Sequence, residues 1–279
     1  MFTYNPFTEL AAFIPATVMQ MYVIAMAVLV VGGTLIDTLH KKSAKWFFEN
    51  SKNAQESATR TLSSGDKAGI AVSTVASEVL TSSEFSNPQR RLSHLLTMYG
   101  FIFFILSTAV MVFYYPTAAT PTPPIWPLLW HLGALSLCVG GYWFWFFIRV
   151  DVSAEGKPWY KLARADLFIV SLLAMATFAL IWSYLQATGS AWQTLFLGLF
   201  ILASTLLFST VLWSKFAHMF FKPMAAYQKR ITKADGSAEN LPTNTRDDPA
   251  QQKRHSMELL KDAPMDMGLG IKREGSSHY

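Results

Sequence analysis

Apolar residues form five long stretches along this chain, and polar residues fill the segments between and after them. The stretches cover approximately residues 11–36, 93–115, 126–149, 165–187 and 192–221. Each is long enough for a helix that crosses the hydrocarbon core of a bilayer, which needs roughly 20 residues. The pattern therefore predicts an all-α fold, an integral membrane bundle of five transmembrane helices.

The first stretch has no basic residue ahead of it and is longer than the apolar core of a signal peptide, so we expect it to remain in the mature chain. Four regions then follow: the N-terminus with helix one, a cytoplasmic connecting segment, the bundle of helices two to five, and a cytoplasmic tail. They span residues 1–36, 37–92, 93–222 and 223–279.

The distribution of positive charge predicts the orientation. Of the 279 residues, 52% are hydrophobic and only 15% are charged, which is too apolar for a soluble domain of this length. All 23 Lys and Arg residues fall on one side: eight between helices one and two, four between helices three and four, and eleven from Lys215 onward. Because cytoplasmic segments retain positive charge, we expect the N-terminus outside and the C-terminus in the cytoplasm. The net charge of +5 thus reflects topology and anionic lipid rather than nucleic-acid binding.

Several chemistries are excluded by the sequence. The single cysteine, Cys138, lies inside helix three, so the chain forms no internal disulfide and supplies no Cys-rich iron–sulfur or zinc motif. Glycine-rich nucleotide loops, nucleophile elbows and HExxH motifs are also missing from it. An odd number of helices without an internal repeat weighs against a transporter.

The polar segments carry two further expectations. Residues 67–80 of the connecting segment are apolar on one face, which suits a surface helix on the membrane or a partner, although a solvated loop fits equally well. The tail is polar and is not expected to fold alone. Near its end, residues 264–271 alternate apolar and polar positions and could lie extended along a soluble partner, with a disordered spacer as the alternative.

Two of the six histidines share one depth in the bundle. His94 lies just inside the start of helix two, and His218 lies just inside the end of helix five. An imidazole inside a bundle is costly unless paired, and two imidazoles from facing helices can bind the two axial positions of one haem iron. Cations lie where haem propionates would emerge: Arg90, Arg91, Lys215 and Lys222. Two unrelated interfacial histidines are the other interpretation.

His131 stands near the opposite face, at the start of helix three. Its helical face continues through Ala134, Cys138 and Gly141, small residues that permit either close helix packing or the flat approach of a macrocycle or quinone. Ordinary packing, a second haem and a contact with a quinone head group therefore remain open for His131. Solvated roles are expected for His255 and His278, and an interfacial role for His40, with a ligand role for His40 as the alternative.

The closing stretch Trp213–Pro223 (WSKFAHMFFKP), together with His94 at the opening of helix two, resembles the nitrate reductase gamma-subunit superfamily of di-haem cytochrome b anchors. The similarity covers about residues 10–230. It is greatest to membrane subunits linked to adenylylsulfate reductase and heterodisulfide-reductase-like complexes, including the haem domain of the quinone-interacting oxidoreductase membrane subunit. Because the ferredoxin-like cysteines of the fused forms are missing, the chain looks most like the short adenylylsulfate reductase membrane anchor of sulfur-oxidising bacteria.

This resemblance implies a non-catalytic subunit in the bacterial inner membrane. It would pass electrons through haem b between a cytoplasmic iron–sulfur flavoenzyme, adenylylsulfate reductase, and the quinone pool. His94 and His218 match the family's cytoplasmic-side haem pair. The family's distal haem uses further histidines on helices two and five, which are missing here, so a second haem would depend on His131. The alternatives are a haem-free structural anchor that only recruits the soluble enzyme, and a small transporter that uses His131.

Overall fold

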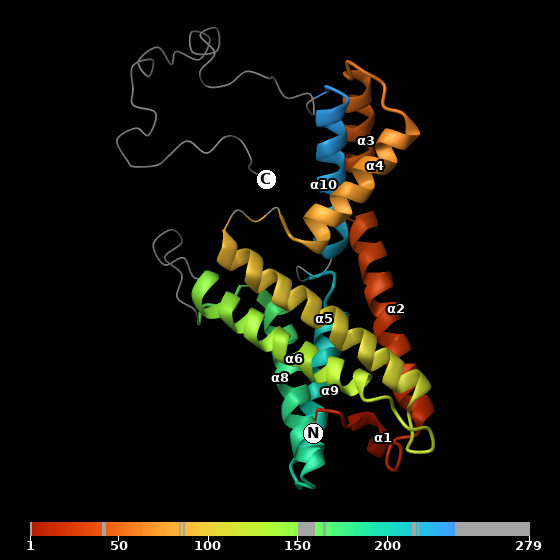
Figure 1. Ribbon diagram of the computed structural model, residues 1–279, viewed down its shortest axis with the longest axis vertical. Coiled ribbons are helices and arrows are strands. Elements are labelled where there is room, and N and C mark those ends of the chain that lie inside the picture. The colour runs from red at the N-terminus through yellow and green to blue at the C-terminus, as the bar shows by residue number, and fades with distance from the viewer. Residues whose placement is uncertain are drawn as a thin grey trace, which may run out of the picture. The chain divides into compact units, whose positions relative to one another are not determined.

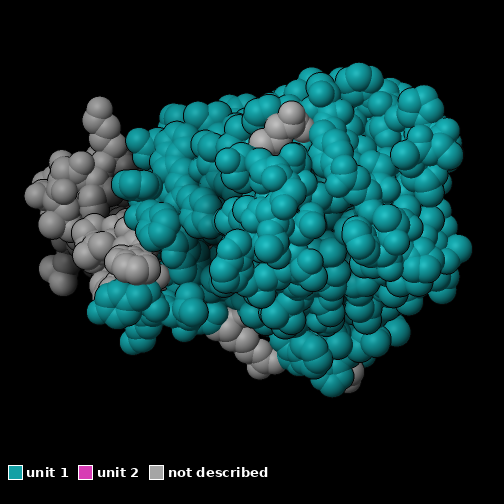
Figure 2. All heavy atoms as spheres, turned by 90° about the horizontal axis from the view of Figure 1, so that it is seen from below, with its two compact units in different colours: residues 1–46, 75–225 teal, residues 47–74, 226–279 magenta. Residues whose placement is uncertain are grey.

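The chain is described by a computed structural model that covers residues 2–40, 43–83, 85, 87–149, 160–163, 166–213, 216 and 218–237. All the regular elements in these ranges are helical (Figure 1). The chain divides into two compact units, one of residues 1–46 and 75–225, the other of residues 47–74 and 226–279. We call them unit 1 and unit 2. Figure 2 shows one face of unit 1, on which side chains form a continuous packed surface.

Four helices in the described ranges are long and apolar enough to cross a membrane: Ala16–His40 (α2), Pro88–Tyr114 (α5), Ile125–Ile148, and Leu167–Ala187 (α8). The third consists of α6 (Ile125–Trp143) and a π-helical turn, η2 (Phe144–Ile148). They correspond to the first four predicted stretches. The chain is thus an all-α protein whose apolar helices indicate a multi-pass membrane protein in a lipid bilayer.

The fifth predicted stretch is not one helix. Its first part forms α9 (Gln193–Ser209), and after a turn the chain resumes as α10 (His218–Ala234). With 17 residues, α9 is about 25 Å long, shorter than a hydrocarbon core of about 30 Å. Between the two helices, Phe216 is 2% exposed and packs edge-on against Phe168 and Phe101. Burial of this ring holds this part of the chain against the bundle.

Local sequence signals explain where helices begin and end. The side chain of Asn87 accepts hydrogen bonds from the backbone N–H groups of Gln89 and Arg90, and Pro88 occupies the first position of α5, where its missing N–H has no cost. At the end of α8, Gly189 takes a positive φ of 66°, and Ser190 N–H donates to Leu185 O, which closes a Schellman turn.

In unit 1, α5 packs on α6, α6 on α8 and α8 on α9 (Figure 1). Aromatic rings fill the centre of this bundle. Trp130 stacks on Phe104 with ring centroids 5.0 Å apart, and Trp182 stacks on Phe200 at 5.6 Å. Phe7 of α1 (Pro6–Leu10) meets both tryptophans edge-on. By contrast, α2 contacts α9 and α5 but has only two buried residues in its described length, Met19 and Asp37.

The α5–α6 contact is very close because glycines face backbone. A Cβ on Gly133 would lie 2.7 Å from the backbone N of Phe104, and one on Gly100 would lie 2.8 Å from Gly133 O. Two hydroxyls also cross this contact, since Ser93 Oγ donates to Gly140 O and Ser136 Oγ donates to Leu96 O, both at 2.8 Å. Small residues and interhelical hydrogen bonds are what hold helices together in a bilayer, where apolar side chains gain little by leaving lipid.

Unit 2 joins the connecting segment to the first part of the tail. It contains most of α3 (Ser43–Glu56), α4 (Ser64–Thr74) and the end of α10. Ser63 and Asp66 form reciprocal hydrogen bonds at the start of α4, and the bonds from Ser63 lower the pKa of the Asp66 carboxyl. Residues 67–80 are helical, as α4 and the π-helical η1 (Val75–Leu80), so of the two structures left open for them the helix is the one present.

The tail begins as structure that depends on the connecting segment. Gln228 accepts a hydrogen bond from Ser51 Oγ at 3.3 Å, Arg230 donates to Ser73 Oγ at 3.2 Å, and Asp235 O accepts from Thr59 N at 3.0 Å. Polar residues of the tail therefore fold here against another segment. The predicted extended cluster at 264–271, with His255 and His278, lies outside the described residues.

Candidate functional site

His94 is held by a turn that precedes α5. Its Nδ1 lies 2.9 Å from Ser82 Oγ, and its ring lies 5.0 Å from that of Phe85. The same turn is tied to α5 at two further points, because Arg91 Nε donates to Thr81 O and Tyr99 Oη donates to Leu80 O, both at 2.7 Å. We refer to residues 80–83 and 85 as the Ser82 turn. It fixes the direction of the His94 ring.

Ser82 adopts an unusual backbone conformation to make this contact. Its φ is +49°, which places a residue with a Cβ in the left-handed region at a cost of about 1–2 kcal/mol, and its side chain is fully buried. Strained residues of this kind persist where the surroundings hold them and often lie at functional sites. Metal-binding imidazoles are usually oriented by a hydrogen-bond acceptor on their second ring nitrogen, and the Ser82 hydroxyl can accept such a bond from Nδ1.

The start of α10 lies beside this end of α5. Phe85, which contacts the His94 ring, also lies under the Lys222 ammonium, with Nζ 5.2 Å from the ring centroid. Lys222 follows His218 by four residues, about one helical turn. In addition, Phe101, seven residues beyond His94 on the same face of α5, contacts Phe216 at 6.5 Å. Two contacts therefore join the face of α5 that carries His94 to the chain around His218.

The other predicted residues at this end have varied placements. Arg90 is exposed in the first turn of α5, and Arg91 and Lys222 have the contacts given above. For His218 the structure describes the backbone, as the first residue of α10, and not the side chain. Lys215 lies outside the described residues, and His40 is exposed at the end of α2. The sequence did not predict Ser82 or Phe85. Both lie in a Ser-rich segment, and nothing in its pattern indicates that a hydroxyl and a ring from it contact His94.

His131 is fully buried near the other end of the bundle, and both nitrogens of its ring lie at hydrogen-bonding distance from a partner. Nδ1 lies 2.7 Å from Pro127 O, and Nε2 lies 2.8 Å from Ser183 Oγ on α8. A carbonyl can only accept, so Nδ1 carries the proton, and in the neutral ring Nε2 accepts from the Ser183 hydroxyl. The rings of Phe2 and Trp130 meet the imidazole edge-on at 5.5 and 4.8 Å.

The small residues beyond His131 are packed against α8. Ala134 is fully buried, Cys138 Sγ lies 3.7 Å from Thr177 Oγ1, and a Cβ on Gly141 would lie 2.6 Å from Leu173 Cδ2. Of the two possibilities that the sequence left for this face, close helix packing is the one present.

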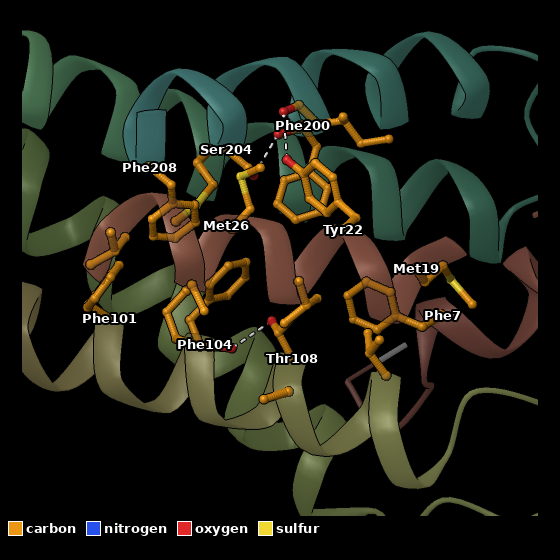
Figure 3. A pocket seen from close by; sticks show the side chains of 18 of the residues that line it. Phe7, Met19, Tyr22, Met26, Phe101, Phe104, Thr108, Phe200, Ser204 and Phe208 are labelled. Carbon is orange, nitrogen blue, oxygen red and sulfur yellow. Dashed lines mark hydrogen bonds between the residues drawn. The ribbon is translucent and has the colours of Figure 1, made fainter. Parts of the chain in front are cut away.

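Unit 1 also has an apolar cavity of about 460 Å³ between α2 and the helices α5 and α9 (Figure 3). It extends from Phe7 and Leu10 at one end to Phe216 and Met219 at the other. Three of its lining residues carry hydroxyls, Tyr22, Thr108 and Ser204, and no histidine is among the side chains that the structure describes along it.

Of the three candidate haem ligands, His94 and His131 have side chains that the structure describes, and the two differ in how well they fit that role. His94 has the second contact that an axial histidine needs, a polar group on Nδ1. For His131, ligation through Nε2 would require breaking its bond to Ser183.

A comparison with known proteins gives no match: no family model, no curated protein and no solved structure matches this chain.

Proposed function

We propose that this chain is a cytochrome b membrane anchor that passes electrons between a cytoplasmic iron–sulfur flavoenzyme and the membrane quinone pool. The observation that carries the proposal is the anchored His94 ring beside the first turn of α10, where His218 lies. Two histidines on adjoining helix ends are the ligand set for one low-spin haem b. The soluble partner that best suits this subunit is adenylylsulfate reductase, on the resemblance of residues 213–223.

The residues of this end would have separate tasks. His94 and His218 would ligate the haem iron, and Ser82 would orient the His94 ring. Arg90, Arg91, Lys215 and Lys222 would offer positive charge to the propionates. When bound, haem b supplies one-electron transfer between the partner's clusters and quinone. Only this one haem is proposed, because ligation of a second by His131 would require breaking its bond to Ser183.

The membrane arrangement completes the proposal. We take α9 as the fifth span, with tilt or local thinning to compensate for its length, so that the N-terminus lies outside and the tail lies in the cytoplasm. Unit 2 would then carry the docking surface for the soluble enzyme in the cytoplasm of the bacterial cell. The alternative is a haem-free anchor with the same docking role. The absorbance spectrum described next distinguishes it from the cytochrome.

The test is the absorbance spectrum of the purified protein, reduced with dithionite, with haem quantified. The wild type should show the sharp alpha band of bis-histidine haem b at one equivalent per chain. His94→Ala and His218→Ala should each abolish it, whereas His40→Ala should not. Ser82→Ala should retain the band but bind haem roughly 10–100-fold more weakly, with Ser83→Ala as its control. A wild type without haem, or a full low-spin spectrum in either histidine variant, would refute the proposal.

A further inference from the structure

The cavity between α2 and the rest of unit 1 is elongated and extends along the helices. Its lining on α2 extends from Val18 to Val31, about 20 Å at a rise of 1.5 Å per residue, and on α5 from Phe101 to Val112. A volume of about 460 Å³ lies within the range of ligand pockets. Several of its lining residues are exposed, Val18, Val31 and Phe220 among them, so the cavity is open along part of its length. An apolar occupant would gain dispersion contacts with its walls.

The polar atoms of the lining are already used within the protein (Figure 3). Tyr22 Oη lies 3.1 Å from Ile201 O and 3.0 Å from Thr205 Oγ1. Thr108 Oγ1 donates to Phe104 O and accepts from Trp130 Nε1, and Ser204 Oγ donates to Phe200 O at 2.7 Å. Among the side chains that the structure describes, none that lines the cavity is charged. Water would therefore find few partners here, and so would the carbonyl oxygens of a quinone ring.

From this geometry we infer that the cavity is a binding site for one acyl chain of a membrane phospholipid. The chain lies lengthwise between α2 and α5, at the depth where the helices cross the hydrocarbon core. It fills the space that α2 leaves when it packs on the bundle with only Met19 and Asp37 buried. The acyl chain would thus form part of the contact between α2 and the other helices of unit 1. Of the two proposed haem ligands, His94 does not line this site.

The experiment uses the full chain in phosphatidylcholine nanodiscs that contain a small share of phosphatidylcholine with a diazirine on one acyl chain. After irradiation, adducts are mapped by mass spectrometry. We expect them to concentrate on cavity residues, Met26 and Thr108 among them. Ala109→Phe, which places a phenyl group in the cavity, should lower these adducts roughly tenfold because a packed ring excludes the chain. Ala27→Phe places a phenyl group in the cavity from α2 and should also lower the adducts. It replaces Ala109→Phe if that variant fails to fold.

Ala25→Phe is the matched control. Ala25 is exposed on α2 and does not line the cavity, so the adducts at Met26 and Thr108 should persist. Adducts spread evenly over lipid-facing residues, with no loss in Ala109→Phe or Ala27→Phe, would overturn the site. If added ubiquinone-10 displaced the adducts, the occupant would be an isoprenoid chain and the assignment to a phospholipid would be wrong. Haem content plays no part in these readouts, so the result stands apart from the proposed function.

Discussion

A buried histidine in a membrane bundle requires partners for both ring nitrogens, and His131 finds them within the protein. Pro127 O is on its own helix, one turn back, and Ser183 is on α8. The side chain thereby bonds two spans at a depth where an unpaired nitrogen would be costly. This bonding favours the packing role for His131 over a ligand role.

The first residue-scale prediction follows from that bond. Ser183→Ala removes the hydroxyl and leaves His131 Nε2 unpaired, so the free energy of unfolding should fall by about 1–2 kcal/mol, measured by denaturant titration in mixed micelles. Ser171→Ala is the control, because Ser171 is also buried on α8 but bonds the backbone of its own helix at Leu167. Haem content should not change in His131→Ala. Loss of one haem equivalent in that variant would instead identify His131 as a ligand.

The sequence could identify such residues but not their partners. His94 and His131 stood out because imidazoles are rare at hydrocarbon depth, and this required only the hydrophobic pattern. Ser82 and Ser183 are among many serines, and nothing in their spacing distinguishes them. Ser82 becomes significant only when a positive φ turns its hydroxyl onto His94, and Ser183 only when α8 packs on α6. Both depend on tertiary contacts.

At the scale of elements, hydrophobic stretches predicted four helices well and the fifth less well. Apolar length is a sufficient signal for a span because every backbone group in lipid must be bonded within its own helix. That signal cannot show an interruption when most of the interrupting residues are themselves apolar. Residues 211–213 and Phe216 continue the apolar stretch, yet α9 ends at Ser209, and Phe216 packs against Phe101 and Phe168.

The glycine contact between α5 and α6 supports a prediction about helix association. Gly133→Ala would place a methyl group 2.7 Å from a backbone atom, which cannot rotate away, so the helices must separate. We expect a loss of about 1–3 kcal/mol or failure to assemble, measured by thermal unfolding of the purified protein. Gly198→Ala on α9 has nothing within 4 Å of its new Cβ and should be neutral or slightly stabilising. Equal stability of the two variants would show that α5 and α6 do not pack this closely.

At the scale of the whole molecule, the number of membrane spans determines on which side of the membrane the tail lies. If α2, α5, α6, α8 and α9 all cross the membrane, the two ends of the chain lie on opposite sides. If α9 does not cross, the tail returns to the side of the N-terminus, and the eleven basic residues from Lys215 onward would lie outside, against the tendency of positive charge to remain in the cytoplasm. The charge distribution therefore favours α9 as a span despite its 17 residues.

This prediction is tested with single cysteines in a Cys138→Ala background and a maleimide that cannot cross the membrane. Thr120→Cys, between α5 and α6, and Ser190→Cys, between α8 and α9, should react in spheroplasts. Ser63→Cys and Ser237→Cys should react only after the membrane is opened. Comparison of Ser190→Cys with Ser237→Cys isolates α9, because the two positions lie on either side of it in the chain. Labelling of both in spheroplasts would show that α9 does not span, and the soluble partner would then have to dock without the tail.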